Sequence, residues 1–340
     1  MDPRLAAVAA ANGGPFRVGE ALRAGYTEGK VRHLVSTGAW TRLRRGICVE
    51  TALLERCDPV HRHALHVAGA VLALGGTVVC SHESAALLHD VALLDRPAED
   101  EVTLTRPDGS SHRDHVRGAR IHLAQVSPRH VERLFGMPIT GAARTVVDLA
   151  RWLPFEAAVV AADAAMYRLA VDRAELAKII GECAGWRGVP RATRVLEAAD
   201  PRARSPLETL GRLMCAEAGL PAPMVSTYIG DERGPYTEVD LYWPDSGVIV
   251  LFDGMVKYDD PRANRNEKLI QARLENDGFI VVRLAWADVT RRRAESVSPG
   301  PVPRKGYSGR LDDGCGETTV EGRPGRPAFA GRGVCRVTGP

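Results

Sequence analysis

Three ionisable residues in the last third of the chain have the types and spacing of a metal-dependent phosphodiesterase. Asp240 sits in an alternating segment, and Asp253 ends an apolar run a short distance later. Carboxylate oxygens are the hard ligands that Mg²⁺ prefers, and a nearby lysine can stabilise the charge on a reacting phosphate. The sequence therefore predicts Asp240, Asp253 and Lys257 as catalytic residues, with Asp240 and Asp253 as the Mg²⁺ ligands.

The elements that position these carboxylates are two strands and a helix. Residues 239–243 alternate as a strand does, residues 244–247 (Pro-Asp-Ser-Gly) are typical of a turn, and residues 248–252 form an unbroken apolar run. The two strands predict a hairpin, with one aspartate on its first strand and another at the end of its second. An aspartate before a glycine is also a common turn, so an alternative without a metal site stays open.

These residues resemble the PD-(D/E)XK nuclease superfamily, and most closely its very-short-patch-repair endonuclease branch. The resemblance covers about residues 203–292 and implies a restriction-endonuclease-like α/β domain, with Glu208 as a further catalytic residue. It rests on Ser205-Pro206-Leu207-Glu208, Val239-Asp240, Phe252-Asp253-Gly254, the segment 267–276 and the segment 278–283. One departure concerns activity: the family carries a metal-binding Glu where this chain has Leu251. Leucine cannot coordinate a metal, so the resemblance implies weakened or absent cleavage.

The first 50 residues predict a winged helix-turn-helix. Two short helical segments near residues 5–11 and 17–24, and a third that starts at Thr27, precede a hairpin over residues 38–49. This segment contains eight Lys or Arg and four Asp or Glu, which favours an acidic polymer as its partner. The predicted DNA-binding residues are Lys30 and Arg32 on the third helix and Arg42, Arg44 and Arg45 on the hairpin.

The same stretch resembles the N-terminal domain of AbiEi-type antitoxins, which is similar in its Trp-x-Arg-Leu-x-x-Gly ending. The resemblance implies double-stranded DNA as a partner and a cognate toxin as a further possible partner. The alternative is a small helical cap whose arginines are merely solvated.

Residues 51–200 predict an α+β middle domain. Helices are expected over 59–74, 81–89, 141–150, 155–167, 173–183 and 190–198, and strands over 77–80, 101–105 and 119–123. Two of its motifs, Ser-His-x-Ser-Ala-Ala from Ser81 and Ala-Arg-Thr-x-x-Asp-Leu-Ala from Ala143, resemble the same antitoxin-like proteins.

Two chemical interpretations of this middle domain are set aside. Ser81, His82 and Asp148 have the residue types of a hydrolase triad, but helix capping by Ser81 and an Arg144–Asp148 pair at i, i+4 explain them better. His63 and His66 lie at i, i+3, a spacing that a metal site allows, but no third ligand has a natural place. The histidines at positions 61, 63 and 66 are therefore expected to be solvated helix residues.

Length and composition exclude several other classes. A chain of 340 residues predicts two or three domains, and its seven scattered cysteines argue against a disulfide framework or a zinc ribbon. A cytoplasmic location and no membrane partner are expected, because no signal peptide is visible and the apolar run 67–79 is too short for a span. From residue 296 onward, 16 of 45 residues are Gly or Pro, which predicts a disordered tail.

The sequence thus predicts a multidomain protein of mixed α+β and α/β class, with four parts. These are a winged helix-turn-helix (1–50), an antitoxin-like middle domain (51–200), a nuclease-like domain (201–292) and a disordered tail (293–340). The predicted function is a DNA-binding protein with a nuclease-like domain, in phage defence or toxin–antitoxin regulation. The alternatives are a catalytically inactive, antitoxin-like transcriptional repressor and a structural adaptor without nucleic-acid contacts.

Overall fold

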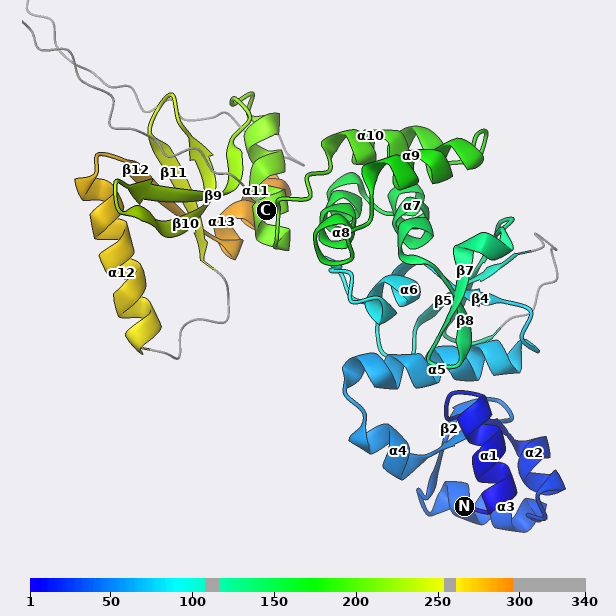
Figure 1. Cartoon of the computed structure of the whole chain (residues 1–340). Coiled ribbons are helices and arrows are strands. Elements are labelled where there is room, and N and C mark those ends of the chain that lie inside the picture. The colour runs from blue at the N-terminus through cyan, green and yellow to red at the C-terminus, as the bar shows by residue number, and fades with distance from the viewer. Residues whose placement is uncertain (108–115, 254–260, 296–340) are drawn as a thin grey trace, which may run out of the picture. The chain divides into compact units, whose positions relative to one another are not determined.

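The computed structural model describes residues 1–107, 116–253 and 261–295 (Figure 1). The chain divides into two compact units, Met1–Leu213 and Met214–Pro340. The finer division at residues 50, 200 and 292 stays a prediction. Lys257 and the tail from residue 296 lie outside the described residues, so the expectations for them also stay predictions.

The first 50 residues form a small domain of helices and a three-stranded antiparallel sheet of order β1-β3-β2. Its elements are α1 (Pro3–Ala11), β1 (Phe16–Arg17), α2 (Val18–Arg23), α3 (Glu28–Ser36), β2 (Trp40–Arg44) and β3 (Ile47–Glu50). The Thr27 hydroxyl accepts a hydrogen bond from Lys30 N at 3.2 Å, which confirms the expected cap of α3. The core packs around Leu5, Phe16 and Trp40, with the two aromatic rings edge to face. The three helices and the hairpin are as predicted, and β1 is an addition.

Two helices, α4 (Thr51–Arg56) and α5 (Pro59–Ala73), lead out of this domain, and α5 packs against its hairpin. Gly69 allows the close approach, because a Cβ there would lie only 3.2 Å from Leu43 Cδ1. Leu43, Val49 and Leu65 form a buried cluster across this contact. The small domain therefore rests on α5 within the first unit (Figure 1).

A five-stranded mixed sheet of order β6-β5-β4-β8-β7 lies on the other side of α5. Its strands are β4 (Val79–Cys80), β5 (Val102–Arg106), β6 (Ala119–Leu123), β7 (Val131–Leu134) and β8 (Met137–Thr140), with α6 (His82–Leu88) after β4 and the 3₁₀ turn η1 (Pro128–His130) before β7. The predicted strands 101–105 and 119–123 are confirmed as β5 and β6, which pair in parallel.

Four helices complete the core of the first unit. They are α7 (Ala142–Trp152), α8 (Phe155–Arg168), α9 (Arg173–Glu182) and α10 (Val189–Ala198). Alanine-rich faces let α7 and α8 pack closely around Leu149, Leu176 and Ile179. Leu213, on α11 (Pro206–Glu217), also belongs to this core, so the first unit includes the start of α11.

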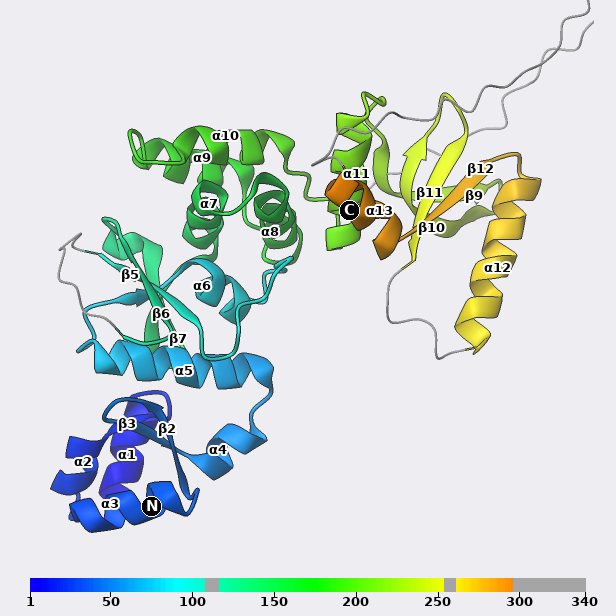
Figure 2. The same cartoon turned by 180° about the vertical axis from the view of Figure 1, so that it is seen from behind.

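The second unit contains a four-stranded sheet of order β12-β11-β10-β9. Its elements are β9 (Met224–Asp231), β10 (Gly234–Trp243), β11 (Val248–Asp253), α12 (Pro261–Asn276), β12 (Ile280–Ala285) and α13 (Trp286–Glu295). The predicted hairpin is confirmed, with Leu241 opposite Val250. Helix α12 packs on one face of the sheet through Leu274, beside Ile249 (Figure 2). The endonuclease fold itself stays a prediction.

Candidate nucleic-acid interface

Helix α3 presents a basic face on the small N-terminal domain. Val31 is buried, and Leu34 and Val35 pack beside it against the domain core. Lys30 and Arg32 are exposed on the remaining surface of the helix. Successive helix residues are about 100° apart around the axis, so Lys30 and Arg32 lie on the two flanks of the buried Val31, where both are exposed. They are therefore free to reach a nucleic-acid backbone.

The hairpin β2–β3 carries the other basic residues of the domain. It turns at Arg45-Gly46, where Gly46 has φ of +75°. Arg42 and Arg45 are exposed. Arg44 is placed differently: its Nη2 donates to the Asp100 carbonyl at 2.7 Å, and burial lowers the pKa of its guanidinium. Arg44 thus tethers the hairpin to the middle domain, and its role as a phosphate contact stays a prediction.

The predicted metal ligands of the second unit have protein partners. Asp240 Oδ2 accepts a hydrogen bond from Phe252 N at 2.6 Å. Asp253 Oδ1 accepts from Arg283 Nε at 3.0 Å, and Arg283 Nη2 also contacts Asp253 and donates to Glu267 Oε2 at 2.8 Å. These hydrogen bonds, first of all the one with Asp253, raise the pKa of Arg283. One guanidinium therefore pairs with two carboxylates.

The position of Arg283 follows from sheet geometry. Leu251 on β11 pairs with Arg283 on β12 in parallel register, so both side chains point to the same face. Asp253 lies two residues beyond Leu251 on that face, and the long guanidinium side chain reaches it. Arg283 lay inside a motif quoted from the sequence, but its pairing with a residue 30 positions away had no local signal.

Glu208 has a structural role at the start of α11. Its Oε1 accepts from Ser205 Oγ at 2.7 Å, and its backbone N donates to the same hydroxyl oxygen at 3.2 Å. The Ser205 hydroxyl thus caps the helix, and the Glu208 carboxylate also accepts from Arg204 N at 2.9 Å, so both side chains hold the helix start. Glu208 belongs to the first unit, whereas Asp240 and Asp253 belong to the second. The convergence of the three carboxylates stays a prediction.

The described side chains also show whether the second unit could bind Mg²⁺. Within residues 1–107, 116–253 and 261–295, no group of three or more His, Cys, Asp or Glu side chains is placed to hold a metal ion. Leu251 offers no oxygen, and the oxygens of Asp253 already accept from a cation. The described side chains of the second unit therefore do not fit a resident Mg²⁺.

Ser81 does not cap its helix in the way expected from the sequence. It is the N-cap residue of α6, but its hydroxyl makes no capping bond. Instead, the buried hydroxyl accepts from Thr105 Oγ1 at 2.8 Å and contacts His82 Nδ1 at 3.0 Å. The Arg144–Asp148 pair is confirmed, with Nε and Oδ2 at 2.8 Å. Because Asp148 binds arginines, the triad interpretation gains no support.

The expectation of solvated histidines on α5 is wrong for His63. Its side chain is buried, with Nε2 at 2.9 Å from Ser84 Oγ and Nδ1 at 3.0 Å from the Glu99 carbonyl. His63 therefore joins α5 to α6, and burial lowers its pKa. The periodicity of α5 places residue 63 on the same face as the buried Val67, and that was the signal available in the sequence.

A second buried histidine forms a stack with a neighbour. The rings of His82 and His122 lie 3.8 Å apart with 14° between their planes, and Trp152 meets His122 edge to face. Burial lowers the pKa of both His82 and His122 to about 3. Both rings are therefore neutral in the folded protein at neutral pH.

This stack predicts a loss of stability on acidification. In the unfolded chain a histidine takes up a proton near pH 6.5, whereas the folded protein resists it, so stability is present above pH 6.5 and is lost as pH falls toward 3. Between pH 7 and pH 5, we expect His82 to lower the free energy of unfolding by about 2 kcal/mol. The contribution of the partly exposed His122 should be smaller because solvent screens its charge.

His82→Asn tests this expectation. Asparagine does not titrate and tolerates the positive φ of +50° at this position. The free energy of unfolding, measured with urea, should fall between pH 7 and pH 5 in both proteins. The fall should be about 2 kcal/mol smaller in the variant than in the natural chain. The exposed His33→Asn is the control and should keep the pH dependence of the natural chain. An equal pH dependence in the natural chain and His82→Asn would contradict the assignment.

The small N-terminal domain thus has the helix-turn-helix and β-hairpin of a DNA-binding regulator. Residues 3–47 match the family model described as a transcriptional regulator, AbiEi antitoxin. The chain is also similar to two curated proteins of Mycobacterium tuberculosis, the uncharacterized protein MT2308 of strain CDC 1551 / Oshkosh and the uncharacterized protein Rv2248 of strain ATCC 25618 / H37Rv. Each is 29% identical over 210 residues, covering 62% of this chain and 77% of the relative.

The family match confirms the AbiEi antitoxin type of the N-terminal domain. Such a regulator domain implies DNA binding, whereas the nuclease resemblance of the second unit stays a prediction. Across the part of the chain that the structure describes, no helix is both long and apolar enough to cross a membrane.

Proposed function

We propose that this protein is a DNA-binding transcriptional regulator of the antitoxin type. The observation that carries the proposal is the pairing of a helix-turn-helix with a hairpin, both of which expose basic residues. Lys30 and Arg32 project from α3, and Arg42 and Arg45 project from the hairpin. The match of residues 3–47 to the AbiEi antitoxin regulator model supports the same function.

The geometry suggests a division of labour between helix and hairpin. Helix α3 has the size and exposed face to enter a major groove, and the hairpin arginines then meet the flanking phosphates. Arg44 fixes the hairpin through the Asp100 carbonyl, which holds Arg42 and Arg45 in a defined orientation. A fixed hairpin loses less conformational entropy on binding than a mobile one.

The test of this function is DNA binding by the full-length chain. The probe is a duplex from the region upstream of the protein's own coding sequence, and the control is a random duplex of equal length. At ~50 mM salt we expect binding to both and a preference for the upstream duplex. The slope of log K against log[salt] should be about −0.9 for each phosphate contact. Absence of binding to either duplex at this salt concentration would contradict the proposed function.

We further propose a cognate toxin as the protein partner and a role in phage defence or toxin–antitoxin regulation. The support for both is the antitoxin type of the N-terminal domain. Co-expression with the protein encoded next to this chain, followed by co-purification and a growth assay, tests this extension separately from DNA binding.

Mg²⁺-dependent phosphodiester cleavage is the second candidate function, and the placement of Asp240 and Asp253 on neighbouring strands favours it. Against this candidate, Arg283 pairs with both Asp253 and Glu267, so it occupies carboxylate oxygens that a metal ion would need. We therefore propose that the natural chain cleaves DNA slowly or not at all, as an antitoxin-like repressor would.

Leu251→Glu tests the metal site of this second candidate. The added carboxylate supplies an oxygen ligand beside Asp253, so the affinity for Mg²⁺ should rise by about tenfold. Calorimetric titration with Mg²⁺ and a plasmid-nicking assay are the measurements, and Leu251→Gln is the control that adds bulk without charge. Asp240→Asn should abolish any cleavage. Rapid Mg²⁺-dependent cleavage that survives Asp240→Asn would overturn the assignment of the site.

A further inference from the structure

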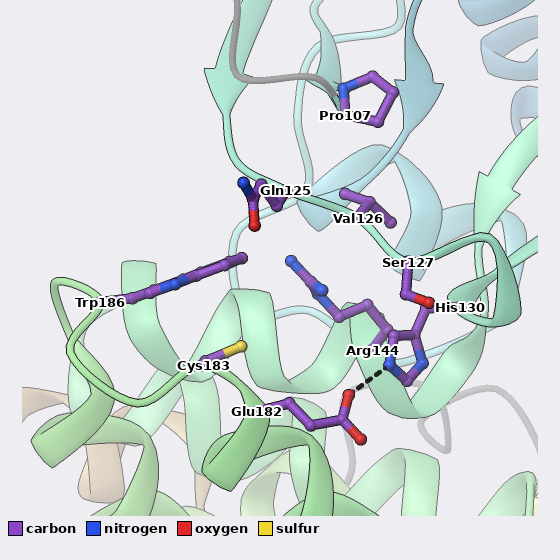
Figure 3. Close-up of a pocket in the computed structure, with 9 residues that line it drawn as sticks. All are labelled: Pro107, Gln125, Val126, Ser127, His130, Arg144, Glu182, Cys183 and Trp186. Carbon is purple, nitrogen blue, oxygen red and sulfur yellow. Dashed lines mark hydrogen bonds and ion pairs between the residues drawn. The ribbon is translucent and has the colours of Figure 1, made fainter.

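A pocket of about 330 Å³ lies in the first unit, between the segment that joins β6 to β7 and the helices α7 and α9 (Figure 3). Gln125 and Ser127 line it from the segment, Arg144 lines it from α7, and Trp186 lines it from the turn after α9. Its volume is at the lower end of the range found for small-molecule sites. The DNA-binding surface proposed above does not include any of these residues.

Arg144 is the buried polar group at the centre of this pocket. Its side chain is only 4% exposed, and its Nε donates to Asp148 Oδ2 at 2.8 Å. Nη2 of the same guanidinium is fully buried, and no acceptor within the described parts of the chain lies in hydrogen-bond range. A buried donor without an acceptor costs about 1–3 kcal/mol, more when it is charged. Figure 3 shows this guanidinium between Trp186 and Ser127, pointing toward Gln125.

The charge balance around Arg144 is positive. Asp148 also accepts from Arg151 Nη1 at 3.1 Å, so two guanidinium groups share one carboxylate. The carboxylate of Glu182, which also lines the pocket, is occupied by Arg129 at 2.5 Å and His130 at 2.8 Å. An oxyanion beside Arg144 would therefore neutralise an excess charge as well as accept from the unpaired N–H.

Trp186 adds an apolar wall to the same space. The Arg144 and Arg151 guanidinium carbons lie 5.3 and 4.9 Å from the centroid of its ring. These cation–π contacts hold the indole in place. A flat apolar body can then pack along the indole while its charged end meets Arg144.

We propose that this pocket binds a small organic oxyanion, a carboxylate or a phosphate ester, through the unpaired Nη2 of Arg144. The Ser127 hydroxyl and the Gln125 amide at the mouth supply further hydrogen bonds, and Trp186 contacts the body of the ligand. This site is a property of the antitoxin-like middle domain and does not depend on whether the N-terminal domain binds DNA.

Isothermal titration of the full-length chain with two probes tests the proposal. Inorganic phosphate supplies the oxyanion alone, and sodium benzoate supplies a carboxylate on a flat apolar body. In a low-salt buffer without other oxyanions, we expect at least one probe to bind with a Kd of about 1 mM or below. Gln125→Glu, an exposed change that places a negative charge at the mouth, should weaken that binding by about tenfold.

Trp186→Ala distinguishes the two ligand classes, because it should weaken benzoate and leave phosphate unchanged. Arg144→Lys should abolish binding of both, and Gln125→Glu keeps the proposal falsifiable even if that buried change disturbs folding. Failure of both probes to bind the natural chain at ~10 mM would overturn the proposal, since that concentration is well above the expected Kd. Equal binding by the natural chain and Gln125→Glu would overturn it as well.

Discussion

Replacing Lys30, Arg32, Arg42 and Arg45 together by alanine is expected to weaken DNA binding by on the order of 10³-fold at ~50 mM salt. All four side chains are exposed on α3 and the β2–β3 hairpin. Each lost phosphate contact should reduce the slope of log K against log[salt] by about 0.9, so the four changes together reduce it by about 3.6. Fluorescence anisotropy with a labelled duplex over a range of salt concentrations measures both quantities.

A control must show that the loss of DNA affinity depends on where the basic residues lie and is not caused by the lower net charge alone. Lys178 on α9 and the nearby Arg187 are exposed and lie outside the N-terminal domain, so their double alanine variant removes the same charge as one helix or hairpin pair. This control variant should have the same slope of log K against log[salt] as the natural chain. Arg44→Ala should lower thermal stability because it removes the tether to the Asp100 carbonyl. A control variant that loses as much affinity as the Lys30/Arg32 double variant would contradict the proposed interface.

The sequence was most informative where local chemistry decides the structure. Thr27 begins α3 because its hydroxyl caps the helix, and residues 244–247 form a hairpin turn because of their turn chemistry. The Arg144–Asp148 pair also follows from helical spacing alone. The AbiEi antitoxin type of the first domain was recognised from a short motif and an element order, and both lie within the first 50 residues.

Contacts between distant residues account for the features that the sequence could not predict. Arg44 was grouped with Arg42 and Arg45, but its carbonyl acceptor lies 56 residues away. Arg283 meets Asp253 across 30 residues. Side-chain periodicity shows which residues share a face, but it does not show which distant partner that face will meet. The metal hypothesis therefore considered the oxygen ligands and missed the cation that pairs with them.

Asp163 in the core of the first unit also pairs with residues that are distant in the sequence. Its replacement is expected to destabilise the fold strongly. This side chain on α8 is 1% exposed. It accepts from Asp200 N at 2.7 Å, Thr209 Oγ1 at 2.8 Å and Arg212 Nη2 at 2.9 Å. One carboxylate thus joins α8 to the segment before α11 and to α11 itself. The sequence offered a single signal, a charge with two alanines on either side of it in an alanine-rich helix.

Asp163→Ala is expected to lower the free energy of unfolding of the first unit by about 3–5 kcal/mol, because it leaves a guanidinium, a hydroxyl and a backbone N–H without their acceptor. Burial raises the pKa of Asp163 to about 6, so the folded protein holds this proton more tightly than the unfolded chain does. Its contribution to stability therefore falls as pH rises from about 4 to 6 and is constant above that range. Urea unfolding at about pH 7.5, where the carboxylate is ionised, avoids this dependence.

Arg202→Ala is the matched control for that measurement. Arg202 lies in the same segment and pairs with Asp200 at 2.7 Å, but it is 59% exposed. Solvent screens the exposed Arg202 guanidinium, although the Asp200 carboxylate is only 14% exposed, so this variant should cost clearly less stability than Asp163→Ala. Asp163→Asn keeps one acceptor oxygen and should fall between the two. Loss of a buried acceptor that serves three donors should lower the free energy of unfolding more than loss of Arg202 does. If Asp163→Ala lowers it no more than Arg202→Ala, the carboxylate does not hold the start of α11 to α8.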